Sequence, residues 1–380
     1  MAVRSLAFAL PLHGLVDVVE SASAHAERPT AYGARLEAGA EYDSNPTRRE
    51  DVEGTTALGP LVPSLALRLA LSADADQRTT DRLSLSLGGG LAARKLADPG
   101  AIGEDLLIGD GHAGAAFTLS DHFSLGAAAA YYDVAQRADT IEDARDFRSV
   151  APSARVMARF GRSRVQLGGG WRWFTFKPAR ELDFAGPTAS LGYAFDPTFS
   201  LDGGADWEAS VGGSLEERRF PSVACAANQA GCPSAGVSTR LDRFYAFDGE
   251  VTRTSETLVG LGLGVQHNDS DLVGQSLWRL LVRLRLVLLL PWDFSFTARG
   301  ELVLTSYSDA VLVGQGPTPG NFVTIEDEGR SSLRLDLSRP LVSHLEAGLR
   351  ATIYQQTPAN GPVRFSRQIY LVYLAVTFGR

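Results

Sequence analysis

Charged side chains recur at every second residue in several segments of this 380-residue chain. Residues two apart project from the same face of a β-strand, and the residues between these charges are mostly apolar. Charges of both signs on one face either pair across neighbouring strands or line a wet passage and bias which solutes enter it. Both interpretations require a face that is solvated or paired. The candidates are Arg155, Arg159, Arg172, Asp202, Asp206, Glu208, Asp248, Glu250, Arg279, Arg283, Arg285, Arg299 and Glu301.

Residue types that serve catalytic and metal sites are sparse. The segment 267–270 reads His-Asn-Asp-Ser, but adjacent residues of a strand point apart and cannot form a catalytic triad by themselves. Asp110 and His112 project from the same face of a predicted strand, and an ion pair between them explains this placement as well as a catalytic role does. Cys225 and Cys232 lack the CxxC spacing of a zinc site, and a disulfide between them would fit an oxidising compartment. We therefore expect no enzyme, no metal site and no cofactor.

The elements that hold these charges are predicted to be β-strands, because apolar residues alternate with polar or small ones. In the last segment Tyr370, Val372 and Leu374 share one face, and residues 32–45 have the same pattern at the start of the chain. If these two segments pair, no strand edge remains and the sheet closes into a cylinder. The sixteen predicted strands are 32–45, 61–72, 83–91, 107–119, 123–131, 150–160, 165–173, 187–195, 199–211, 244–252, 259–265, 278–288, 294–304, 333–337, 345–353 and 368–380.

The predicted connections alternate between short and long. Segments 120–122 and 291–293 are short, whereas 43–56, 212–241 and 306–322 are long and polar or rich in Gly and Pro. Aromatic residues of outward parity gather at both ends of the predicted strands. Short turns on one rim, long loops on the other and two aromatic girdles are typical of outer-membrane barrels. We predict an all-β, transmembrane, antiparallel up-and-down β-barrel of about sixteen strands in a Gram-negative outer membrane, with fourteen or eighteen strands also compatible.

The composition and the N-terminus set further limits. The net charge of −8 argues against nucleic acid as a partner. The most apolar run, 277–290, carries three arginines of one parity, which suits a strand with a wet face. Arg4, a mostly apolar stretch over 5–19 and small residues at 24–26 are typical of a secretory signal. We expect a signal peptide over 1–26 and a single transmembrane barrel domain over 27–380.

The first hairpin carries a family resemblance. It reads Glu41-Tyr42-Asp43-Ser44-Asn45-Pro46 and then Leu61-Val62-Pro63-Ser64-Leu65. An aromatic-Asp-x-Asn motif followed by a Pro-Ser pair resembles the opening of a diffuse group of outer-membrane barrels. That group includes barrels of exopolysaccharide export and the barrel part of surface lipoprotein assembly modifiers. The match covers about a tenth of the chain, and the end departs from the usual barrel signal because Gly379 and Arg380 follow Phe378.

Two functions remain open from the sequence. The first is a water-filled, porin-like passage for polar solutes, for which the resemblance implies polysaccharide export. The second is a structural or assembly barrel with a plugged lumen, whose extracellular loops bind a partner. The expected partners are outer-membrane lipid, the barrel assembly machinery, and either a periplasmic export partner or further copies of the chain in a homo-oligomer.

Overall fold

The structure is a computed structural model that describes residues 30–46, 51–52, 62–98, 105–137, 146–177, 183–196, 206–225, 236–271, 276–307, 330–356 and 363–379. No helix within these ranges is long and apolar enough to cross a membrane. The strands are β1 (Thr30–Asp43), β2 (Asp51–Val52), β3 (Ser64–Arg78), β4 (Leu83–Leu96), β5 (Asp105–Ser120), β6 (Phe123–Arg137), β7 (Phe147–Phe160), β8 (Ser163–Phe176), β9 (Phe184–Phe195), β10 (Asp206–Cys225), β11 (Gly236–Thr254), β12 (Thr257–Ser270), β13 (Leu277–Leu290), β14 (Phe294–Tyr307), β15 (Ser331–Val342), β16 (Leu345–Gln356) and β17 (Val363–Gly379), with a 3₁₀ turn, η4, at Pro291–Asp293.

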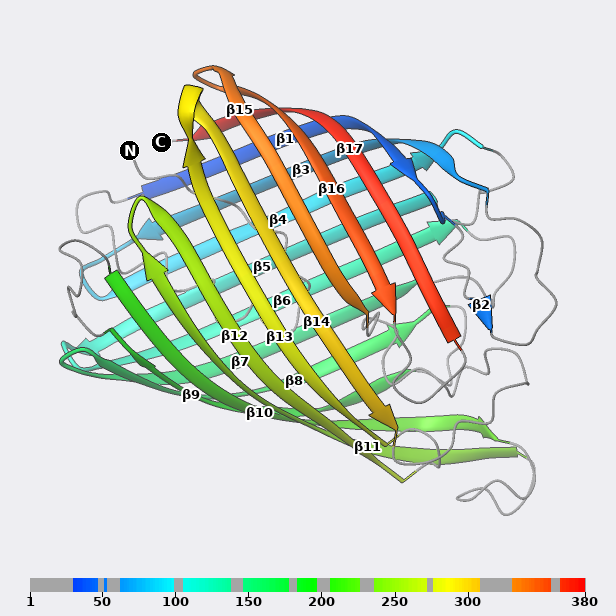
Figure 1. Ribbon diagram of the computed structural model, residues 1–380. Coiled ribbons are helices and arrows are strands. Elements are labelled where there is room, and N and C mark those ends of the chain that lie inside the picture. The colour runs from blue at the N-terminus through cyan, green and yellow to red at the C-terminus, as the bar shows by residue number, and fades with distance from the viewer. Residues whose placement is uncertain are drawn as a thin grey trace.

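The sheet closes on itself (Figure 1). Seventeen strands of the described ranges belong to it, and β2 contributes only a two-residue pairing with the start of β17, which leaves sixteen strands in the ring. Each ring strand pairs antiparallel with its neighbour in the chain, and β1 pairs with β17 from Gly33–Gly379 to Asp43–Ile369. The predicted closure between the two ends of the chain is confirmed, and the predicted count of sixteen is confirmed over fourteen or eighteen.

Ion pairs identify the inner face of this ring. The Arg94 Nε of β4 lies 2.6 Å from the Glu41 Oε1 of β1, across the intervening β3. The Arg172 Nη1 of β8 lies 3.4 Å from the Glu216 Oε1 of β10, across β9. Strands two apart are separated by about 10 Å, so such contacts form where side chains converge on the concave side. The ionic parity therefore faces the lumen.

The opposite parity is apolar and exposed. Leu67 is 70% exposed and Leu284 is 48% exposed, although both are large aliphatic side chains within regular strands. Continuous exposure of such residues around a closed ring is stable where hydrocarbon replaces water. Phe123 and Phe160 make an edge-to-face contact at 6.2 Å beside the short turns, which fits an interfacial girdle.

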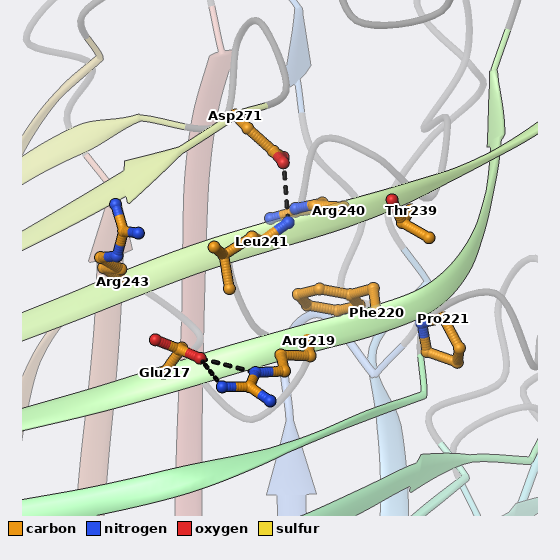
Figure 2. A pocket seen from close by; sticks show the side chains of 9 residues that line it. All are labelled: Glu217, Arg219, Phe220, Pro221, Thr239, Arg240, Leu241, Arg243 and Asp271. Atoms are coloured by element: carbon orange, nitrogen blue, oxygen red, sulfur yellow. Dashed lines mark hydrogen bonds and ion pairs between the residues drawn. The ribbon is translucent and has the colours of Figure 1, made fainter.

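The predicted long loop 212–241 is wrong over most of its length. β10 continues to Cys225 and β11 begins at Gly236, so the two strands form a hairpin that extends past the apolar band. Its outward positions carry Glu217, Arg219 and Arg243 beside a cleft of about 560 Å³ (Figure 2). The backbone ladder continues there while the outward residues become charged. That change removed the apolar alternation that marks a membrane strand in the sequence.

Candidate functional site: the inner wall of the barrel

The structure describes most of the predicted lumen residues and leaves some predictions outside its ranges. Asp202 and Cys232 lie outside the described residues, and so do residues 1–29 with the predicted signal peptide. The disulfide and the signal peptide therefore stay predictions. Cys225 is the last residue of β10. The remaining candidates lie on β7, β8, β10, β11, β13 and β14: Arg155, Arg159, Arg172, Asp206, Glu208, Asp248, Glu250, Arg279, Arg283, Arg285, Arg299 and Glu301.

A paired network joins β15, β16, β17 and β1 on the inner wall. Arg350 donates to both carboxylate oxygens of Glu37, at 2.7 and 3.0 Å, and to Asp336 at 2.6 Å. The Tyr373 hydroxyl donates to Asp336 at 2.7 Å. Tyr373 reaches across β16 because its ring lies over Gly348, where an added Cβ would meet the ring at 2.2 Å. This network stabilises the seam where the first and last strands meet.

The network continues towards Asp43 at the C-terminal end of β1. Glu41 pairs with Arg94 of β4 at 2.6 Å and with Arg68 of β3 at 3.6 Å. Asp43 is fully buried and accepts from Arg367 of β17 and from Arg94. Acidic and basic groups therefore neutralise each other along this part of the wall. None of these partners belonged to the predicted set, although Glu41 and Asp43 lie in the motif that carries the family resemblance.

Inward-facing aromatic rings form a second feature that the sequence did not predict. Tyr132, Phe147, Phe174, Phe184 and Phe220 stack in succession across β6 to β10, with ring centroids 4.9 to 5.6 Å apart. Three of these phenylalanines lie just outside the predicted strands and the fourth in the predicted loop. Extending the alternation from Arg172 by two residues would have placed Phe174 on the inner face.

Arginines cover this aromatic stack. Arg218 is fully buried, with its guanidinium 4.7 Å from the ring centroid of Phe244 and 5.4 Å from that of Phe184. Glu216 accepts from Arg218 at 3.0 Å and from the predicted lumen residue Arg172 at 3.4 Å. A buried carboxylate between two guanidinium groups is both neutralised and hydrogen-bonded. The inner wall is therefore densely packed where the C-terminal ends of β8 and β10 lie beside the N-terminal ends of β9 and β11. We call this region the outer end of β8 to β11.

The predicted acidic residues of β10 and β11 are more accessible. Glu208 lies 3.3 Å from Arg164 of β8, and its side chain is 43% exposed. Glu250 is exposed and accepts from Thr252 at 3.2 Å. Asp206 is also exposed, whereas Asp248 is partly buried. These carboxylates lie in the N-terminal half of β10 and the C-terminal half of β11, away from the aromatic stack.

The predicted basic residues of β13 and β14 differ from one another in pairing. Arg283 pairs with Glu301 at 3.1 Å, and Arg279 donates to Thr305 at 3.3 Å. Arg285 and Arg299 are direct cross-strand neighbours, and each has a buried Nε without a hydrogen-bond acceptor. The two predicted arginines of β7 are placed differently, since Arg155 packs beside Gly126 and Arg159 is exposed near a short turn.

The segment 267–270 divides between the two faces. His267 faces outward and stacks between Tyr245 and Trp278, with ring centroids 6.2 and 4.1 Å away. Asn268 and Ser270 face inward and donate to Asp242. The His and the Ser therefore belong to opposite sides of the wall. Among the described residues, no cluster of His, Cys, Asp and Glu could hold a metal ion.

Comparisons with solved structures find matches of low sequence identity. No protein-family model and no curated protein matches the chain. A BenF-like porin from Pseudomonas fluorescens Pf-5 is 9% identical, with a TM-score of 0.49 over 92% of this chain and 99% of that chain. Pseudomonas putida OprB is 10% identical, with a TM-score of 0.48 over 92% and 94%. Pseudomonas aeruginosa OpdQ is 9% identical, with a TM-score of 0.45 over 92% and 98%.

Proposed function

We propose that this chain is an outer-membrane β-barrel that forms a water-filled passage for polar solutes. The observation that carries the proposal is that the closed ring has an apolar outer face and an ionic inner face. Large apolar residues such as Leu67 and Leu284 are exposed outside, and ion pairs cross strands inside. Such a ring satisfies its backbone hydrogen bonds within lipid, and about sixteen strands enclose a lumen wide enough for water.

The distribution of side-chain size around the ring supports a passage. Bulky ionic residues line β13 to β17, β1, β3 and β4. β6 lies eight strands from β14 in either direction around the ring, and its inward residues from 124 to 130 are Ser124, Gly126, Ala128 and Ala130. These small side chains leave more room along β6 than the long ionic side chains leave on the opposite wall, although Arg155 of β7 reaches over Gly126.

Conductance in planar lipid bilayers tests this proposal. Protein purified from outer membranes, with folding checked by its heat-dependent mobility in gel electrophoresis, should give discrete conductance steps in potassium chloride. A folded preparation that inserts but remains silent would refute the passage. Recovery of the protein from the soluble fraction without detergent would refute the membrane barrel itself.

A structural or assembly barrel with a closed lumen is the second candidate. The packed outer end of β8 to β11 favours it, because Arg218 and Arg240 are 0% and 2% exposed although both project inward. In that case the extended β10–β11 hairpin would present the partner-binding surface. Silence in the bilayer, together with loss of partner capture when the hairpin is shortened, would support this function.

Polysaccharide export is the narrower form of the first proposal and rests on the resemblance of the opening hairpin. A periplasmic export partner or a homo-oligomer would accompany it. Liposome swelling with neutral and acidic oligosaccharides tests the solute class directly. Chemical cross-linking in intact cells tests the partners, including the barrel assembly machinery.

A further inference from the structure

Three arginines of the inner wall lie side by side across adjacent strands. Arg285 of β13 is the Cα partner of Arg299 of β14, and Arg299 is the Cα partner of Arg334 of β15. Directly opposite residues on one face have Cβ atoms about 5 Å apart, and like charges in such pairs repel each other. We name Arg285, Arg299 and Arg334 the arginine row. All three are partly accessible to the lumen.

The carboxylates around the arginine row are engaged elsewhere. Asp336 is 3.7 Å from Arg334, but it also accepts from Arg350 at 2.6 Å and from a tyrosine hydroxyl. Glu301 pairs with Arg283, two residues along the strands from the Arg285–Arg299 pair. Asp336 is therefore the one carboxylate that forms an ion pair with the arginine row among the described residues, and it shares its charge with Arg350.

The strand on the other side of Arg285 brings one more carboxylate near the row. Gly260 of β12 is the Cα partner of Arg285, and an added Cβ there would meet the Glu250 carboxylate at 3.2 Å. Glu250 accepts from Thr252, and no ion pair joins it to Arg285 within the described residues. The Nε atoms of Arg285 and Arg299 are buried without an acceptor, which is costly for charged groups. This part of the wall contrasts with the neutralised network around Glu37 and Arg350.

We propose that the arginine row is a binding subsite for an oxyanion group, carboxylate or phosphate, carried by the solute that passes through the barrel. Guanidinium groups bind such planar or tetrahedral oxyanions through paired, charge-assisted hydrogen bonds. Binding at the accessible parts of these guanidinium groups would bring negative charge to the row and cancel the repulsion along it. The subsite deepens the proposed passage and rests on it only for the claim that the bound anion is a transported solute.

Thermal unfolding of the detergent-solubilised barrel tests binding without reference to conduction. Inorganic phosphate, compared with chloride at equal ionic strength, should raise the melting temperature of the wild-type protein with a saturable dependence. In R299Q the apparent Kd for phosphate should weaken by about tenfold or more, because charge-assisted hydrogen bonds are lost. In chloride alone R299Q should melt at a higher temperature than wild type, because the central like charge is gone.

The matched control is R219Q, which removes one exposed arginine from the outer surface of the β10–β11 hairpin. It should retain the full phosphate response. An equal response in all three proteins would mean a general salt effect and would overturn the subsite. If R299Q does not fold, R285Q replaces it with the same expectation. A parallel titration with succinate distinguishes a carboxylate subsite from a phosphate subsite.

The two proposals fail independently in these measurements. A phosphate response in a barrel without conductance would keep the subsite and refute the passage. Conductance without a phosphate or succinate response would keep the passage and refute the subsite. If both hold, the same anion should reduce single-channel current in wild type and have a weaker effect in R299Q.

Discussion

Arg350 offers a sharp test of how the barrel seam is stabilised. Its guanidinium makes two hydrogen bonds to Glu37 across β17 and a third to Asp336 of β15. The Arg350 and Glu37 side chains are each only 9% exposed. Arg350→Met keeps much of the side-chain volume and leaves both carboxylates without their main partner. Breaking a buried pair by removing one member costs about 3–5 kcal/mol, so the free energy of unfolding should fall by that amount.

Urea unfolding of the barrel in phospholipid vesicles, followed by tryptophan fluorescence, measures this change. The double variant Arg350→Met/Glu37→Gln should lose less than the sum of the single losses, with a coupling of at least about 1 kcal/mol. Arg164→Met is the matched control, because Arg164 also reaches across a strand, but its partner Glu208 is 43% exposed. The control should cost no more than about 1 kcal/mol.

Two results would refute the reasoning. One is an equal loss of stability in Arg350→Met and Arg164→Met, which would mean that burial of the pair is irrelevant. The other is strict additivity in the Arg350 and Glu37 double variant. Either would show that the seam is held by the backbone ladder between β1 and β17 alone.

Three further variants test other parts of the wall. Phe174→Ala should lower the free energy of unfolding by about 3–5 kcal/mol, because this 3% exposed ring stacks on two others, and urea unfolding measures the loss. Leu67→Arg should cost about 2–4 kcal/mol if this outward residue lies near the bilayer midplane, whereas a cost near zero in the same assay would contradict a lipid-facing position. Gly348→Leu should displace the Tyr373 ring and break its bond to Asp336, which a shift in tyrosine ultraviolet absorbance and a lower melting temperature would report.

Much of the fold is fixed by local sequence pattern. The parity of a strand depends only on its own residues, so alternation in segments such as 368–380 and 32–45 predicted which side chains face lipid. Counting such segments predicted sixteen strands, and the matching patterns at the two ends predicted closure. These inferences needed no knowledge of which residue lies opposite which.

The limits of strands outside the membrane were harder to predict. Where the β10–β11 hairpin leaves the apolar band, Glu217 and Arg219 replace outward apolar residues although backbone pairing continues. Phe174 and Phe184 are Cα partners on the neighbouring strands β8 and β9. They were missed because both lie just beyond the limits of the predicted strands. Hydrophobic alternation reports the membrane boundary, whereas the hydrogen-bonded ladder decides where a strand ends.

The partners of the charged residues were decided by tertiary structure alone. Sequence placed Arg172, Arg285 and Arg299 on one parity, but register determines that Arg172 meets a carboxylate while Arg285 and Arg299 meet each other. Curvature then lets Arg350 reach across β17 to Glu37, two strands away. A face is a property of one strand, whereas a pair depends on turn lengths, stagger and ring closure together, and only the folded barrel combines them.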